Sequence, residues 1–176
     1  FNGGGNDILR PRTKASDIVD AFAQVLRRCD EEGVRMILLS GANPSKQLPM
    51  GSVFQRRGDE LSRAVDVHFT GRDDVFRALN WPDDELATPP YWSEDRLHMN
   101  VRGHHRVAAR VLDAVGQQAP EEWWSLPEIE TVGPRGWDYY REHVGPWIQR
   151  RLTRTSSGDG REPKYGLWHV MEPAER

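Results

Sequence analysis

A carboxylate and an imidazole stand three positions apart in the stretch EDRLHMN, where Asp95 precedes His98. One local turn at this spacing brings the carboxylate onto a ring nitrogen of the imidazole. Such a pair fixes the tautomer of the histidine and stabilises the imidazolium that forms when the ring takes up a proton. This is what a general base serving a serine nucleophile requires. Taken alone, the pair has a second interpretation, in which His98 merely caps the following helix.

A side-chain amide follows a glycine run at the start of the sequence, where Gly3, Gly4 and Gly5 precede Asn6. Glycines let the backbone bend tightly and let a ligand approach the main chain. An amide after such a run can donate a hydrogen bond to the oxyanion of a tetrahedral intermediate. The alternative is a glycine-rich turn in which Asn6 bonds to nearby backbone.

Zinc is a second use for the same polar stretch, because Asp95, His98, His104 and His105 lie within eleven residues and histidine is a good zinc ligand. On a helix, however, His104 and His105 project about 100° apart. At most one of them can join His98, so the metal site is the weaker hypothesis and we expect no cofactor.

Helices and a strand must position these groups. Apolar residues recur at helical spacing over residues 16–32, with Ser16 suited to the N-cap and Gly33 to the position after the end. The apolar run at residues 34–39 predicts a strand buried on both faces. Helix, short link and buried strand make half of a βαβ unit.

Weaker patterns follow in the middle of the chain. We predict a helix over residues 59–65, a short strand in VDVHFTG at 65–71 and one or two helical turns over 73–79. The prolines in residues 80–93 predict an irregular surface loop. Its rings Trp81, Tyr91 and Trp92 suit either an apolar lid or packing on the core.

A second amphipathic helix is predicted over residues 102–115, with Gly116 ending it. Beyond Gln117 the sequence becomes rich in tryptophan and proline. Tryptophans at irregular spacing usually attach an extension to a parent domain by burying large rings. The alternative is a carbohydrate-binding or lipid-binding surface.

Composition narrows the class of protein. A chain of 176 residues with 37% hydrophobic residues suits one globular domain. The net charge of −3 gives no general attraction to nucleic acid or anionic membranes, and no apolar run is long enough for stable membrane insertion. The one cysteine, Cys29, predicts a small core residue and suits the cytoplasm, although an export signal on a lost N-terminus stays open.

Both polar stretches resemble blocks of the SGNH, or GDSL, hydrolases. GGND, Gly4 to Asp7, is similar to their third block, and DRLH, Asp95 to His98, is similar to their fifth. The resemblance implies that Asn6 donates to the oxyanion hole, that His98 is the catalytic base and that Asp95 orients it. It covers residues 1 to about 115, and the tail at 150–164 resembles those of actinobacterial members.

The implied fold is a three-layer α/β/α sandwich with a parallel, flavodoxin-like sheet. The family's nucleophilic serine, in a Gly-Asp-Ser block after the first strand, has no counterpart here, and neither has the second block that supplies a glycine N–H. Ser40 follows a strand but lacks a G-x-S-x-G context, so we do not assign it as the nucleophile. We therefore expect that the first strands are missing and are supplied as another chain or a cleaved piece.

These observations lead to one function and one alternative. Residues 1–116 are expected to be the C-terminal part of a hydrolase domain, and residues 117–176 an extension packed on it. The expected activity is serine ester hydrolysis by acyl transfer, as in esterases and lipases, with a small-molecule or lipid ester as substrate. The alternative is a non-catalytic binding or assembly module derived from such a hydrolase.

Overall fold

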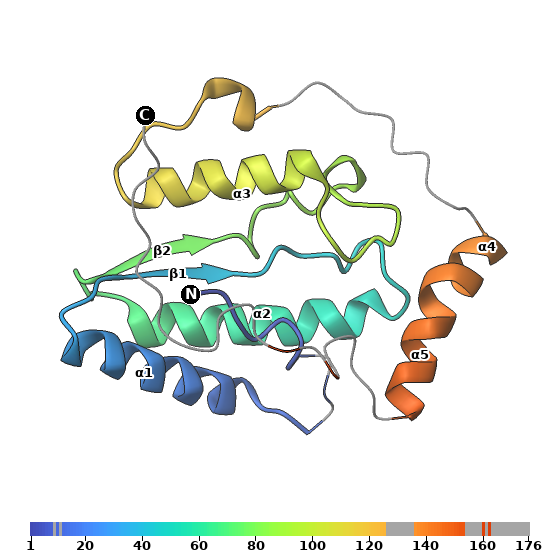
Figure 1. Cartoon of the computed structure of the whole chain (residues 1–176), viewed down its shortest axis with the longest axis horizontal. Coiled ribbons are helices and arrows are strands. Elements are labelled where there is room, and N and C mark those ends of the chain that lie inside the picture. Colours follow the sequence, from blue (N-terminus) through green and yellow to red (C-terminus); the bar gives the residue numbers. More distant parts are fainter. Residues whose placement is uncertain (9, 11, 126–135, 154–159, 161, 163–176) are drawn as a thin grey trace. The chain divides into compact units, whose positions relative to one another are not determined.

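The computed structural model describes residues 1–8, 10, 12–125, 136–153, 160 and 162. The chain divides into two compact units, residues 1–133 and 134–176. In the first unit a small parallel sheet lies between helices, so the structure is mixed α/β (Figure 1). Residues 117–125 belong to the first of these compact units. The predicted division at residue 116, which also followed the family resemblance, stays a prediction.

Helix α1 (Ala15–Glu31) begins close to the predicted position but is capped differently. The residue before the helix is Lys14, whose backbone N–H donates to the Asp17 carboxylate at 3.0 Å, and Ser16 already lies inside the first turn. The end is confirmed, because Gly33 has a φ of 65°, a left-handed conformation that glycine adopts without strain. Cys29 packs half-buried against the core.

Strands β1 (Met36–Ser40) and β2 (Val75–Leu79) pair in parallel, with Met36 opposite Val75. The prediction of helical turns over residues 73–79 was therefore wrong. Pairing with β1 decides the conformation of this segment, and a short-range pattern carries no information on that partner.

The prediction that β1 is buried on both faces was also wrong. Met36 and Leu38 are buried, whereas Ile37 and Leu39, which alternate with them, are only half-buried. The buried pair faces a core that α1 and α2 supply, and Figure 1 shows these two helices together on one side of the sheet and α3 on the other.

The N-terminal residues run parallel to β1 along the edge that β2 leaves free. The Phe1 amino group donates to the Ile37 carbonyl at 2.6 Å, and the Leu39 N–H donates to the Phe1 carbonyl at 2.9 Å. A parallel bridge joins Asn2 to Leu39. Three backbone segments therefore run parallel to one another, in the order residues 1–3, β1 and β2.

Helix α2 (Gly51–Phe69) is much longer than the predicted helix over residues 59–65. The strand predicted over residues 65–71 was wrong, because Val65 to Phe69 form the last helical turns. Val65 and Phe69 stand four residues apart and are both buried in the same core, as expected for one face of a helix.

Residues 80–93 are irregular apart from one short 3-10 helix, as predicted, but their aromatic rings do not lie on the surface. The exposed fractions of Trp81, Tyr91 and Trp92 are 8%, 3% and 3%. Tyr91 and Trp92 pack with Leu86 in a second core cluster, and a short 3-10 helix, η1 (Pro89–Tyr91), contains two of the three prolines. These rings therefore belong to the core.

Helix α3 (Val101–Ala114) matches the predicted element. Asn100 caps it by accepting a hydrogen bond from the Gly103 N–H at 3.1 Å, a standard N-cap role for asparagine. A short 3-10 helix, η2 (Glu121–Trp123), follows, and the Trp123 ring stacks on His105 with centroids 5.1 Å apart.

The second unit contains a helical stretch made of α4 (Trp137–Tyr139), a π-helical turn η3 (Tyr140–Val144) and α5 (Gly145–Leu152). Trp137 is 81% exposed. Most of the predicted tail lies outside the described residues. Among the helices that the structure describes, none is long and apolar enough to cross a membrane.

Candidate active site

Asp95 holds His98 through both of its carboxylate oxygens. Oδ1 accepts hydrogen bonds from the backbone N–H groups of Leu97, at 3.0 Å, and His98, at 2.9 Å. Oδ2 lies 2.5 Å from Nδ1 of the His98 ring. One carboxylate therefore fixes both the backbone turn and the imidazole, and it engages Nδ1 so that Nε2 is the nitrogen that can exchange a proton with a reactant.

The turn that carries this pair is closed at its base. The Ser93 N–H donates to the His98 carbonyl at 2.8 Å, and Trp92 and Met99 form an antiparallel bridge. Buried Trp92 and the N-cap of α3 thus anchor the two ends of the turn. The His98 side chain itself is 75% exposed, which leaves the ring accessible.

Asp95 is ionised over a wide pH range. Burial raises the pKa of its carboxyl group, but hydrogen bonds from the backbone and ring of His98 and from the Leu97 N–H outweigh burial. The pKa of Asp95 therefore lies below its ordinary value. A carboxylate that stays charged is suited to stabilise an imidazolium on His98.

Asn6 is presented by a turn that only glycine permits. The carbonyl of Gly4 accepts from the N–H groups of Asp7, at 3.0 Å, and Ile8, at 3.1 Å. Gly4 has a φ of 82°, and a Cβ there would lie 2.9 Å from Cδ2 of Leu61. Asn6 is exposed on this turn, and its carboxamide bonds to none of the residues that the structure describes.

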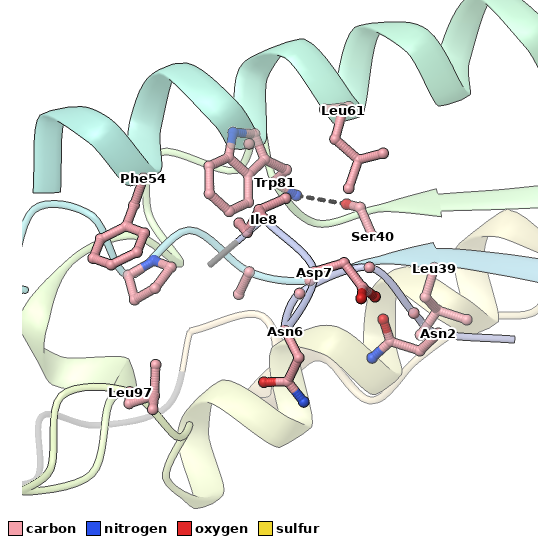
Figure 2. A pocket seen from close by; sticks show the side chains of 18 of the residues that line it. Asn2, Asn6, Asp7, Ile8, Leu39, Ser40, Phe54, Leu61, Trp81 and Leu97 are labelled. Atoms are coloured by element: carbon pink, nitrogen blue, oxygen red, sulfur yellow. Dashed lines mark hydrogen bonds between the residues drawn. The ribbon is translucent and has the colours of Figure 1, made fainter. Parts of the chain in front are cut away.

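Asn6 and His98 line the same cavity of about 620 Å³. Leu39 and Ser40, at the carboxyl end of β1, also line it, which is where ligands bind in parallel sheets. Figure 2 shows Asn6 and Leu97 on one side of this space and Phe54 and Leu61, from α2, on the other. Asp95, which contacts Nδ1 of His98, is not among the lining residues.

Sequence reasoning named Trp81 and Ser40 but missed the contacts through which they build the wall on the α2 side. The Trp81 N–H donates to the Ser40 hydroxyl at 2.8 Å (Figure 2), and its indole Nε1 donates to the Asp59 carboxylate at 2.8 Å. The ring lies on Gly58, where a Cβ would be 1.9 Å from it. Gly58 inside a helix was the available signal for a close neighbour, because glycine is otherwise unfavourable there.

Ser40 and Ser62 are the serines of the lining. The Ser40 hydroxyl accepts from the Trp81 backbone, so it joins the end of β1 to the segment after β2. Within the described part of the chain, no serine hydroxyl is hydrogen-bonded to His98. The structure therefore adds no nucleophile to those considered from the sequence.

The metal hypothesis receives no support from the described residues, among which no three histidine, cysteine or acidic side chains are grouped as a metal site requires. His104 lines the cavity together with His98. His105 is instead stacked on Trp123.

The chain was compared with protein-family models, curated proteins and solved structures, and none of the three comparisons gave a match.

Proposed function

We propose that this chain carries the base, the orienting carboxylate and one oxyanion donor of a serine ester hydrolase of the SGNH type. The observation that carries the proposal is the shared cavity: His98, held by Asp95, and Asn6 line it together although they are far apart in the chain. An acid–base group and an amide donor at one space are what acyl transfer needs.

The proposed reaction proceeds through an acyl-enzyme. Nε2 of His98 takes the proton of a serine hydroxyl as its oxygen attacks the ester carbonyl, and the Asn6 amide donates to the oxyanion that forms. The imidazolium then gives its proton to the leaving alkoxide, and the alcohol departs. Water, deprotonated by His98 in the same way, attacks the acyl-serine and releases the acid.

In this proposal the serine comes from a segment outside these 176 residues. Residues 1–3, β1 and β2 run in parallel in that order, with α1 and α2 on one side and α3 on the other. This arrangement fits the last three strands of a flavodoxin-like sheet of order 2-1-3-4-5. The N–H and carbonyl of Asn2, which alternate with the groups facing β1, point to the free edge where a further parallel strand would pair.

The test is hydrolysis of 4-nitrophenyl acetate by the protein expressed from its complete reading frame. We expect His98→Ala to lower kcat/KM by about 10²- to 10⁴-fold, the range typical of a lost general base. His68→Ala is the matched control, since His68 lies on α2 against Phe69 and outside the cavity, and it should leave the rate unchanged. Equal rates for wild type and His98→Ala would overturn the proposal. Folded protein without any turnover would favour the binding module.

A further inference from the structure

We propose that the cavity beside His98 and Asn6 binds the ester through an unbranched apolar acyl chain, and that Phe54 on α2 sets the preferred chain length. This inference rests on the proposed hydrolase function and specifies its substrate class. The cavity of about 620 Å³ lies within the range of small-molecule sites, whose walls are mostly apolar.

Several apolar side chains of the lining, Leu48, Phe54 and Leu97 among them, lie outside both core clusters of the described residues. These three side chains are half-buried. Apolar surface that faces a cavity without packing against the core gains burial when an apolar ligand enters.

Charge in the cavity is confined to a few positions. The ionisable side chains of its lining are Asp7, His98 and His104, and the described lining contains neither lysine nor arginine. A cavity without a fixed cation in its lining has no ionic partner for the carboxylate of a free fatty acid, and Asp7 is itself paired with Arg10 at 3.4 Å. An uncharged acyl ester fits these walls better.

The positions of the lining residues give the bound acyl chain a direction. Figure 2 shows Asn6 and Leu97 opposite Phe54 and Leu61 across the cavity. An ester whose carbonyl lies at Asn6 and His98 therefore extends its acyl chain toward α2. Phe54 is the fourth residue of that helix. A larger ring at this position shortens the space for the acyl chain, and a smaller side chain lengthens it.

The wall behind the acyl chain is tightly packed. Trp81 is 8% exposed, is held by Asp59 through its indole nitrogen and has no room to move toward Gly58. Phe54 is the better residue to change, because it lines the cavity without joining a core cluster.

The first experiment measures binding without catalysis. Ligand-observed NMR titrations of the protein from its complete reading frame with 1-octanol and 1-butanol give the two dissociation constants. At about fourfold per methylene, 1-octanol should bind about 10²-fold tighter than 1-butanol. Phe54→Trp should remove most of this difference, whereas Val53→Trp, at a neighbouring position of α2 that is 37% exposed and outside the lining, should preserve it. Equal binding of the two alcohols, or an unchanged preference in Phe54→Trp, would overturn the inference.

The second experiment compares kcat/KM for 4-nitrophenyl acetate, butyrate, octanoate and dodecanoate in the protein from its complete reading frame. We expect the optimum to move to shorter chains in Phe54→Trp and to longer chains in Phe54→Ala. An optimum that stays in place in both variants contradicts the inference even if hydrolysis depends on His98. If alcohols bind as expected but His98→Ala hydrolyses esters normally, the proposed function fails and the apolar site stands.

Discussion

The residues of the candidate site differ in how far their contacts reach along the chain, and this decides what the sequence could predict. Asp95 and His98 are three residues apart, and their hydrogen bond was predicted from spacing because a local turn suffices to form it. The shared cavity of His98 and Asn6 joins distant segments. Only the family resemblance suggested that proximity, and their catalytic roles stay predictions.

Asn6 should act on the transition state more than on the ground state. We predict that Asn6→Ala lowers kcat by about 10²- to 10³-fold, as for other oxyanion donors, with a small change in KM. Steady-state kinetics with 4-nitrophenyl butyrate measures both constants. Asn2→Ala is the control, because Asn2 is a second asparagine of the same lining to which no catalytic role is assigned. A loss confined to KM would assign Asn6 to substrate binding instead.

Asp95 should matter through the imidazole that it orients. We predict that Asp95→Asn lowers kcat by about 10²-fold or more, because the amide neither stabilises an imidazolium nor fixes the same tautomer. The neighbouring Glu94→Gln, at an exposed position, should have no effect. Equal losses in the two variants would show that the charge of the loop matters and that the specific contact does not.

At the scale of elements, one buried carboxylate ties the segment after β2 to α3. The Asp83 side chain is 4% exposed and lies 2.9 Å from Nε of Arg106 and 3.3 Å from Nη1 of Arg110. Its Oδ1 also accepts from the N–H groups of Glu85 and Leu86, each at 3.1 Å. Since α3 begins directly after the turn that carries His98, this cluster stabilises the helix on which that turn is anchored.

Removing the Asp83 charge should destabilise the fold. We predict that Asp83→Asn lowers the free energy of unfolding by about 2 kcal/mol, as expected for the loss of charged hydrogen bonds, because Arg106 keeps Glu85 as a partner at 3.0 Å. Urea denaturation measures this difference. Asp84→Asn is a stringent control, because the neighbouring Asp84 side chain is 98% exposed and should change stability by less than about 0.5 kcal/mol. Equal effects of the two variants would contradict the importance of the cluster.

The same carboxylate predicts a pH dependence. Burial raises the pKa of Asp83. Hydrogen bonds from Arg106 and the Leu86 N–H, together with the charges of Arg106 and Arg110, lower the pKa by more than burial raises it, so the pKa lies below its ordinary value. A lowered pKa in the folded state contributes stability that is complete above about pH 4 and is lost as the pH falls through the folded value. Urea midpoints measured from pH 6 downward should fall less steeply in Asp83→Asn than in wild type, and parallel curves would contradict this.

Element boundaries show where sequence reasoning was reliable. Helices α1 and α3 were predicted closely, because their apolar stripes and end signals are local. The segment from Val65 to Leu79 was misassigned, since its short apolar runs suit a helix or a strand equally well. Packing of Phe69 in the core and pairing of β2 with β1 decide it, and neither partner is visible in the local pattern.

At the scale of the whole molecule, the first unit presents three parallel backbones whose outer member is residues 1–3. An open edge of this kind pairs readily with a further strand. The sequence predicted the mixed α/β class with parallel strands, and the structure confirms it. The complete flavodoxin-like sheet and the origin of the nucleophile stay proposals, because they concern residues outside the chain.

The most direct test of the central claim is labelling with a fluorophosphonate probe, followed by mass-spectrometric mapping of the modified residue. In the protein from its complete reading frame, we predict that one serine outside these 176 residues is labelled and that His98→Ala abolishes the reaction. The 176-residue chain alone should stay unlabelled. Labelling of Ser40 or Ser62, labelling that is independent of His98, or no labelling of the complete protein would contradict the claim.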